Sequence, residues 1–317
     1  MPGAPRPQRL HTYTTPGFDS LRWDRFKPRP GDIIVCTPVK SGTTWTQMLC
    51  ALLVHQSPVF PEPLTKLSRW LDRDSEPIED VIAAYEAQEH RRIIKTHTPL
   101  DGLPYYEEAS YVFCGRDPRD VFLSMTDHME NMSPETLAEI LRKSDAPLDF
   151  QVLNDRNLVF PLWITTGAHE WMRDGFPFGS VFDLTKSYWD YRHLPNLFFW
   201  HYADLMADLD TEARRLSAFL GIPVDASRWP SLIAAASYDA MKDRADELAP
   251  GAHFGEWKEN KEFFRMARMG QWREILTPEN QALYDRVSAE IAEPSMKAWL
   301  EGGRRAVGDP KDISEAA

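Results

Sequence analysis

A short polar run between a predicted strand and a predicted helix constrains this chain more than any other feature. The run is Thr37-Pro-Val-Lys-Ser-Gly-Thr-Thr-Trp45; apolar residues 32–36 before it predict a buried strand, and residues 43–54 after it have helical apolar spacing. Gly42 lets the backbone approach a ligand, the helix start presents free N–H groups, and Lys40 adds positive charge. Further donors are the hydroxyl groups of Ser41, Thr43 and Thr44. The run predicts a phosphate-binding loop. It is not the nucleoside triphosphate loop, because Lys40 precedes the only glycine of the run.

Strand-like and helix-like segments alternate along the rest of the chain. Three further predicted strands are Ile93-Ile-Lys-Thr96, Tyr111-Val-Phe-Cys114 and Leu197-Phe-Phe-Trp200, and helical stretches cover about 79–91 and 210–220. This alternation predicts an α/β fold with a central, mostly parallel β-sheet flanked by helices. No repeat or linker divides the chain, so residues 1–317 are expected to form a single domain, with residues 1–30 wrapping its surface. Ligands of such sheets bind beyond the carboxyl ends of the strands, where the polar run lies.

The charge balance limits the classes of ligand. The formal net charge is −12, which argues against nucleic acid as a partner, because nucleic-acid-binding proteins usually carry a basic face. An anionic ligand would have to be bound by a local group of residues. No apolar window is long enough for a transmembrane helix, and the N-terminus lacks the apolar core of a signal peptide. The three cysteines lack a metal-binding or disulfide spacing, which predicts a reduced, cytoplasmic protein.

Two further motifs fall at the ends of predicted strands. Arg116 ends one strand, and Ser124 follows eight residues later on a helix that Asp117-Pro118 is expected to begin. A guanidinium and a hydroxyl suit a phosphate monoester, although the same pattern is compatible with a simple helix cap. In Lys95-Thr-His97, the imidazole has the right ordinary pKa for a base near neutrality, and the alternative is a structural histidine.

Together these motifs resemble those of the cytosolic-type sulfotransferases, which use 3′-phosphoadenosine 5′-phosphosulfate (PAPS). The run Lys40-Ser-Gly-Thr-Thr-Trp45 is similar to the family's 5′-phosphosulfate loop, with Val39 where the family has Pro. The spacing of Arg116 and Ser124 is similar to the 3′-phosphate motif, and Lys95-Thr-His97-Thr-Pro99 to the segment that carries the catalytic base. Residues 90–103 and 299–305 look most like bacterial glycolipid sulfotransferases. The resemblance implies a phosphate-loop-like sulfotransferase fold.

The resemblance also implies residues around the adenosine end of the donor. The segment Phe264-Arg-Met-Ala-Arg-Met-Gly-Gln-Trp272 is similar to the loop that closes over the 3′-phosphate. Met266 and Ala267 replace the family's Lys and Gly, whereas Arg265 matches. Residues expected to flank the adenine, or else to pack in the core, are Tyr202, Ser237 and Tyr238. The family's dimerisation pattern is mostly missing from residues 273–282, so the sequence leaves the oligomeric state open.

Residues from about 129 to 179 match the family least, and residues from about 129 to 190 are expected to cap the acceptor side. Aromatic residues that could line an acceptor pocket, or more simply pack in the core, are Trp70, Phe150, Trp163, Trp171, Phe178, Phe182 and Trp189. Histidines without metal-ligand spacing, interpreted as structural or surface residues, are His55, His90, His128, His169, His193, His201 and His253. The acceptor remains open between a glycolipid, a phenol, a steroid and an alkyl alcohol.

The resemblance implies transfer of a sulfuryl group from PAPS to an acceptor hydroxyl, with release of adenosine 3′,5′-bisphosphate. His97 is then expected to be the base. Lys95 stabilises the sulfuryl oxygens, Lys40 the leaving oxygen, and Ser124 holds the 3′-phosphate and restrains Lys40. No metal is required, because lysine can neutralise the leaving group. The alternatives are a phosphate-loop kinase, which the order of the loop residues disfavours, and a silent bisphosphate-binding protein, which would not need Lys95 and His97.

Overall fold

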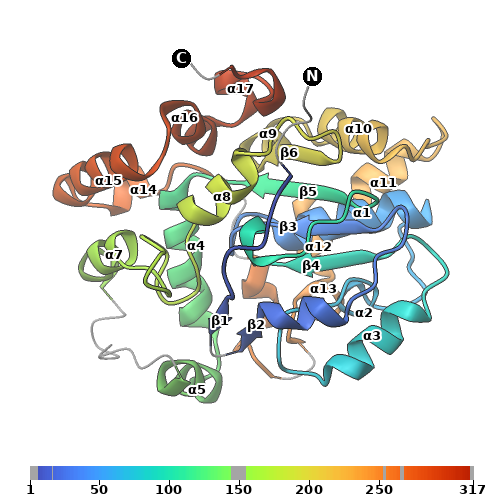
Figure 1. Cartoon of the computed structure of the whole chain (residues 1–317), viewed down its shortest axis with the longest axis horizontal. Helices are drawn as coiled ribbons and strands as arrows, with labels where there is room; N and C mark the ends of the chain where they lie inside the picture. The colour runs from blue at the N-terminus through green and yellow to red at the C-terminus, as the bar shows by residue number, and fades with distance from the viewer. Residues whose placement is uncertain (1–5, 16, 144–154, 253–254, 265–267, 315–317) are drawn as a thin grey trace.

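A computed structural model describes residues 6–15, 17–143, 155–252, 255–264 and 268–314, and Figure 1 shows its architecture. At its centre lies a four-stranded sheet in the order β4-β3-β5-β6, and every neighbouring pair is parallel. The strands are β3 (Ile33–Cys36), β4 (Ile93–Thr96), β5 (Ser110–Gly115) and β6 (Leu197–His201). The α/β fold and all four predicted strands are therefore confirmed, with shifts of a single residue at some ends.

The sheet is buried on both faces because its strands are apolar at nearly every position. Alternate residues face opposite sides: Ile34, Phe113 and Phe199 pack into one half of the core, and Val35, Val112 and Trp200 into the other. The first half is completed by α4 (Pro118–Asn131), α7 (Arg156–Thr165), α8 (Phe182–Trp189), α15 (Pro278–Ile291) and α16 (Pro294–Gly302). The second half is completed by α1 (Thr43–His55), α9 (Tyr202–Ala207), α10 (Leu209–Leu220) and α11 (Trp229–Ala235).

Several helix ends follow the sequence signals. Asp117 caps α4 by accepting a hydrogen bond from Arg119 N, with Pro118 at the first position, and α10 ends at Gly221 with a φ of 61°. The predicted helix 79–91 is shorter than expected, because α3 ends at Glu86. The residues after it extend toward β4, and Arg92 forms a buried ion pair with Asp32 at 2.5 Å. That tertiary contact competes with continuation of the helix.

The segment before β3 contributes to the core as well as to the surface. It forms a small hairpin of β1 (Thr14–Thr15) and β2 (Phe18–Asp19), followed by the 3-10 helix η1 (Ser20–Arg25). Trp23 in η1 is fully buried, and its Nε1 donates to Asp72 Oδ2 at 3.3 Å. Tyr13 is also buried, and its hydroxyl donates to Asp101 Oδ1 at 2.8 Å. These contacts fix the segment beside the mouth of the sheet.

The remaining elements are short. They are α2 (Leu64–Leu67), α3 (Ile78–Glu86), η2 (Leu100–Gly102), α5 (Pro134–Lys143), α12 (Tyr238–Asp243), α13 (Ala245–Leu248), η4 (Asn260–Phe264), α14 (Trp272–Ile275), α17 (Arg304–Val307) and η5 (Pro310–Asp312). Cys36, Cys50 and Cys114 are buried free thiols. In the part of the chain that the structure describes, no helix combines the length and apolar character needed to cross a membrane.

Candidate active site

The carboxyl ends of the strands open onto a cavity of about 730 Å³, at the edge of the sheet where the sequence predicts a ligand. Its wall brings together most of the predicted site residues from segments far apart in the chain: Lys40, Gly42, Thr43, Thr44, Trp45, Lys95, His97, Arg116, Ser124, Tyr202, Tyr238 and Phe264. Ser41 and Ser237 do not line this cavity. Ser41 is fully buried, and Ser237 caps α12 by accepting a hydrogen bond from Ala240 N. Arg265, Met266 and Ala267 lie outside the described residues.

The loop between β3 and α1 has the backbone conformation of a tight anion cradle. Lys40 and Gly42 both have positive φ, at 61° and 100°. A Cβ at Gly42 would lie 3.1 Å from the Tyr202 ring and 3.3 Å from Cys114 Sγ, so a side chain there would be crowded as well as strained. Beyond Gly42, the first turn of α1 presents N–H groups that have no carbonyl partner within the helix. These N–H groups and the positive end of the helix dipole suit a phosphate or sulfate group.

Arg116 closes the cavity on the β5 side. Its Nη1 donates to Lys40 O at 3.0 Å, and its guanidinium carbon lies 4.4 Å from the centre of the Tyr202 ring. Arg116 Nε is buried and has no hydrogen-bond partner within the described residues. A buried guanidinium with an unpaired donor is costly, and an anionic ligand would supply the missing acceptor. Tyr202 also packs edge-on against Trp45, whose Nε1 donates to Ala236 O at 2.8 Å.

The C-terminal segment reaches this end of the cavity from outside the sheet. The Tyr238 hydroxyl donates to Phe264 O, which fixes the end of η4 beside Tyr238. Asp120 Oδ2 accepts a hydrogen bond from Gly270 N at 2.7 Å, so α4 holds the chain just beyond residues 265–267. Trp272 packs under the Arg119 guanidinium at 3.5 Å and does not line the cavity. Both flanks of the predicted 3′-phosphate loop are therefore fixed, one to Tyr238 and the other to Asp120 on α4.

His97 lies at the end of β4 with a defined proton position. Its Nδ1 is 2.6 Å from Thr37 O, and because a carbonyl only accepts, Nδ1 must carry the proton. The other nitrogen, Nε2, is then a free acceptor in a residue that lines the cavity. Burial, followed by the positive charges of Lys95 and Lys40, lowers the pKa of His97 to about 3. The ring is therefore neutral at neutral pH, with a pKa well below the ordinary value on which the sequence analysis relied.

Lys95 and Lys40 bring two buried amino groups to the cavity wall. Lys95 Nζ lies 3.7 Å from the centre of the Trp70 ring, and Lys40 Nζ lies 4.5 Å from that of Phe263. Neither lysine forms an ion pair with a carboxylate of the described chain. Burial is the main cause that lowers the pKa of each lysine to about 7, with Arg73 acting further on Lys95 and Arg116 on Lys40. An anion bound in the cavity would therefore stabilise the charged forms of Lys40 and Lys95 and raise their pKa values.

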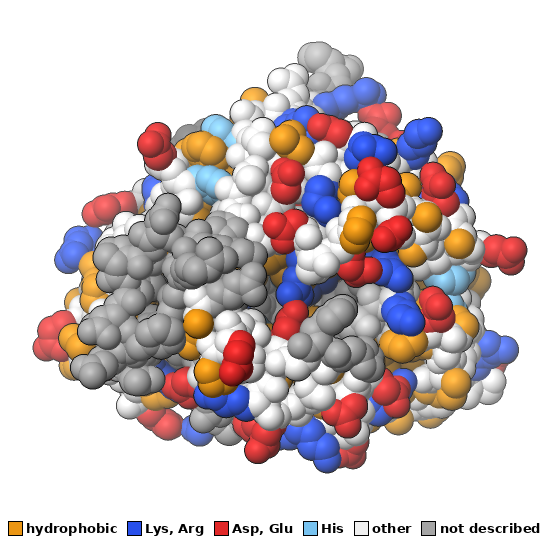
Figure 2. Space-filling model, turned by 90° about the horizontal axis from the view of Figure 1, so that it is seen from below, with side chains coloured by type: hydrophobic (Ala, Val, Ile, Leu, Met, Phe, Trp, Pro, Cys, Tyr) orange, Lys and Arg blue, Asp and Glu red, His pale blue; other side chains and the backbone are white. Residues whose placement is uncertain are grey.

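Charges of both signs occur on the surface and in the cavity. On the face in Figure 2, acidic and basic side chains are interspersed over the surface outside the grey atoms. The cavity wall also carries both signs, with Lys40, Lys95 and Arg116 beside carboxylates such as Asp72 and Asp127, so an anion would be bound by particular basic groups and not by a general field. Among the described residues, no group of three His, Cys, Asp or Glu side chains is arranged to hold a metal ion.

His128 belongs to the site, although the sequence analysis interpreted it as structural or a surface residue. It lines the cavity, and its Nδ1 lies 3.1 Å from Lys40 Nζ. The predicted contact of Lys40 with Ser124 is not among the contacts of the described residues. The sequence did hold a signal for placing His128 beside Ser124, because residues four apart on a helix share a face and His128 follows Ser124 by four. Without the fold, nothing marked that face as the one turned to the cavity.

The rest of the wall comes from scattered aromatic and apolar residues. Of the seven candidates, Trp70 and Phe178 line the cavity, whereas Trp163, Phe182 and Trp189 are buried in the core. Trp171 is exposed and stacks between His11 and His169, and Phe150 lies outside the described residues. Wall residues that the sequence analysis missed include Tyr13, Phe18, His169 and Met172. Only the folded chain brings them together.

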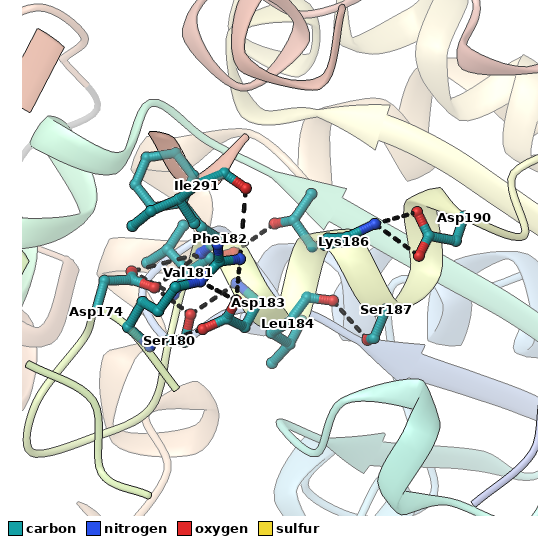
Figure 3. A network of polar contacts seen from close by, with 12 residues as sticks. Asp174, Ser180, Val181, Phe182, Asp183, Leu184, Lys186, Ser187, Asp190 and Ile291 are labelled. Atoms are coloured by element: carbon teal, nitrogen blue, oxygen red, sulfur yellow. Dashed lines mark hydrogen bonds and ion pairs between the residues drawn. The ribbon is translucent and has the colours of Figure 1, made fainter. Parts of the chain in front are cut away.

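A polar network fixes the part of this wall formed by residues 168–179 (Figure 3). The buried Asp174 carboxylate accepts hydrogen bonds from the Ser180 hydroxyl and from Val181 N at 2.8 Å. Ser180 Oγ in turn accepts from Asp183 N at 2.7 Å, at the start of α8. Burial raises the pKa of Asp174 to about 7, and these donors oppose the rise. The network attaches the Phe178 loop to a core helix.

Comparison with known proteins gives a consistent result. The model of the sulfotransferase domain matches residues 30–299. Glycolipid sulfotransferases of Mycobacterium bovis and Mycobacterium tuberculosis are each 39% identical to the chain, and each match covers 90% of this chain and 93% of the relative. The crystal structure of mouse sulfotransferase SULT7A1 with PAP superposes with a TM-score of 0.63 at 20% identity, covering 87% of this chain and 89% of that one. Retinol dehydratase with androsterone and PAP gives 0.67 at 20% identity, covering 89% and 90%.

Proposed function

The chain belongs to the sulfotransferase domain family, and from this premise we propose that it transfers the sulfuryl group of PAPS to an acceptor hydroxyl with His97 as the base. The observation that carries the proposal is the convergence of Lys40, Lys95 and Arg116 on the cavity beside the Gly42 loop, where neither lysine forms an ion pair with a carboxylate of the described residues. A donor with phosphate at one end and phosphosulfate at the other supplies the anions that this cluster lacks.

Both ends of such a donor have a matching set of groups. The phosphosulfate fits the N–H groups after Gly42, with the hydroxyls of Thr43 and Thr44 in the same wall. The 3′-phosphate fits Arg116, whose Nε lacks a partner in the described chain, and Ser124. Tyr202, Trp45, Tyr238 and Phe264 lie on the same side and suit the adenine. Binding roles for Ser41, Ser237 and residues 265–267 remain part of the proposal through the family resemblance alone.

The reaction that these residues support is an in-line transfer. The acceptor oxygen attacks sulfur while its proton moves to His97 Nε2, which is free because Nδ1–H donates to Thr37 O. The bond between sulfur and the bridging phosphate oxygen breaks, and that oxygen keeps the electron pair. Lys40 stabilises the negative charge on the leaving oxygen, and Lys95 that on the sulfuryl oxygens. The products are the sulfated acceptor and adenosine 3′,5′-bisphosphate.

The acceptor proposed is a glycolipid, a phenol or another alcohol. The 39% identity to mycobacterial glycolipid sulfotransferases supports a glycolipid first. The cavity wall mixes Trp70, Phe178 and Met172 with polar groups such as Thr98 and Asp72, which suits a hydroxylated molecule with apolar faces. The buried free thiols of the three cysteines support a reducing, cytoplasmic setting.

The test is a transfer assay with labelled PAPS and a panel of glycolipids, phenols, steroids and alkyl alcohols. We expect release of the bisphosphate together with an acceptor product heavier by one sulfuryl group. Transfer of phosphate from ATP with Mg²⁺ would instead support a kinase. Tight binding of the bisphosphate without turnover of any acceptor class would support the silent binding protein.

A further inference from the structure

Lys40, the residue proposed to stabilise the leaving oxygen, is held by a neighbour outside every motif. Its Nζ lies 3.1 Å from His128 Nδ1 on α4. Trp257 and Phe263 pack against the His128 ring with centroid distances of 4.5 and 5.7 Å, and Phe263 also lies under Lys40 Nζ. The lysine and the histidine therefore share one aromatic enclosure at the cavity wall.

The direction of this hydrogen bond follows from the chemistry of the two groups. A lysine ammonium has three donors and no lone pair, so a charged Lys40 must donate and His128 Nδ1 must accept. The ring proton of a neutral His128 then sits on Nε2. His97 has the opposite arrangement, because its Nδ1–H donates to Thr37 O. His97 and His128 are thus expected in opposite tautomers: His97 keeps an acceptor at Nε2, and His128 keeps a donor at Nε2.

The surroundings decide which group carries the charge. Five titratable or charged groups act on the Lys40–His128 pair from the surrounding elements. They are Lys95 on β4, His97 just after β4, Arg73, Arg116 and Asp127. Burial and the positive neighbours hold the pKa of His128 well below its ordinary value, so this ring stays neutral. The same causes act against the Lys40 ammonium, which needs a compensating acceptor to remain charged.

We propose that His128 is a positioning residue for Lys40, whose ammonium it keeps charged and directed by accepting its hydrogen bond at Nδ1. The sequence resemblance gives a restraining role to Ser124, whereas the contact lies four residues further along α4. The inference rests on the proposed role of Lys40 in sulfuryl transfer. A hydrogen bond from an ammonium to a neutral imidazole stabilises the charged lysine and therefore raises its pKa relative to a cavity without the acceptor.

The kinetic test compares three variants at the same helix. In His128→Leu the acceptor is lost, so the alkaline limb of kcat/KM for PAPS should move down by about one pH unit. In His128→Asn the amide oxygen occupies a place close to Nδ1 and should restore most of that limb. Met129→Leu, a buried neighbour outside this cavity wall, controls for disturbed packing of α4. An unchanged alkaline limb in a folded His128→Leu protein would overturn the proposal.

A spectroscopic test on the wild-type protein does not depend on the variants being stable. In NMR spectra of the protein labelled with ¹⁵N and ¹³C in histidine at neutral pH, His97 should give the Nδ1–H signature and His128 the Nε2–H signature. The signals of each residue are assigned by its substitution with Asn. An Nδ1–H or imidazolium signature for His128 would refute the hydrogen bond as drawn. A wild-type protein with the expected tautomers but no turnover of PAPS would refute the proposed function and leave the contact intact.

Discussion

The two sides of the cavity are built in different ways. The proposed donor side consists of the loop 37–45, Arg116 and α4, which are short contiguous motifs joined by hydrogen bonds between side chains and backbone groups. The proposed acceptor side consists of Tyr13, Phe18, Trp70 and residues 168–179, which come from separate segments held by side chains. A ligand shared by a family can be recognised by contiguous motifs. A ligand that differs between members is bound where the chain is free to vary.

Removal of His97 should have the largest effect of the substitutions considered, because the proposed base lies where the two sides meet. His97→Ala should lower kcat by about 10²–10⁴-fold, since it removes the group proposed to take the acceptor proton. Bisphosphate binding should persist, and the lost hydrogen bond to Thr37 O should cost only about 1 kcal/mol of stability. Steady-state kinetics, isothermal titration with the bisphosphate and thermal denaturation measure the three quantities.

The matched control is His55→Ala, which removes a half-buried histidine that packs against Phe60 and His90 away from the cavity. It should leave kcat within about twofold of the wild-type value because it alters only local packing. Retained turnover in a well-folded His97→Ala protein would remove the base from the mechanism.

Arg116→Ala should separate the donor side from the acceptor side. If the guanidinium binds the 3′-phosphate in the ground state and the transition state alike, as proposed, KM for PAPS should rise by about 10–100-fold, with a smaller change in kcat. KM for the acceptor should stay constant. Arg214→Ala, which removes an exposed arginine paired with Asp210, controls for loss of charge. An equal rise in both KM values would show that the two sides are not independent.

The pH dependence of donor capture should follow the lysines of the donor side. Burial is the main cause that lowers the pKa of Lys40 and Lys95 to about 7 in the free enzyme, and only the protonated forms attract the donor. The value of kcat/KM for PAPS should therefore be highest below pH 7 and fall by about tenfold per lysine between pH 6 and pH 8. Bound anion raises both pKa values, so kcat should fall only at higher pH. Parallel profiles of kcat/KM and kcat would contradict this assignment.

The same division explains what could be predicted from the sequence. The four strands, the Asp117-Pro118 cap and the end of α10 are encoded by neighbouring residues, and the structure places Lys40, Lys95, His97 and Arg116 around one cavity as the motifs indicate. The early end of α3 is followed by the tertiary Arg92–Asp32 ion pair, and the position of His128 depends on which face of α4 turns inward. Such features require tertiary contacts, which spacing along one chain does not reveal.

The smallest effect is expected on the acceptor side, at Asp174. Its carboxylate accepts from the Ser180 hydroxyl and from Val181 N, and it is fully buried, which raises its pKa to about 7. In Asp174→Asn the amide oxygen can still accept from Val181 N, while the amide N–H can donate to Ser180 Oγ. The substitution also removes a buried charge, which offsets part of the lost hydrogen bonding. We therefore expect a stability loss of only about 1 kcal/mol.

The weaker hydrogen bonding in Asp174→Asn should make the Phe178 loop less rigid and so disturb the cavity wall. KM for the acceptor should rise about two- to fivefold, as a loss of that size allows, while KM for PAPS and bisphosphate binding stay at wild-type values. Asp190→Asn, which breaks an exposed ion pair with Lys186 at the C-terminal end of α8, should change neither KM. Because the Asp174 network touches no donor-side residue, a change confined to donor binding would show that the two sides are coupled through the core. A change confined to the acceptor would assign residues 168–179 to the acceptor side by measurement.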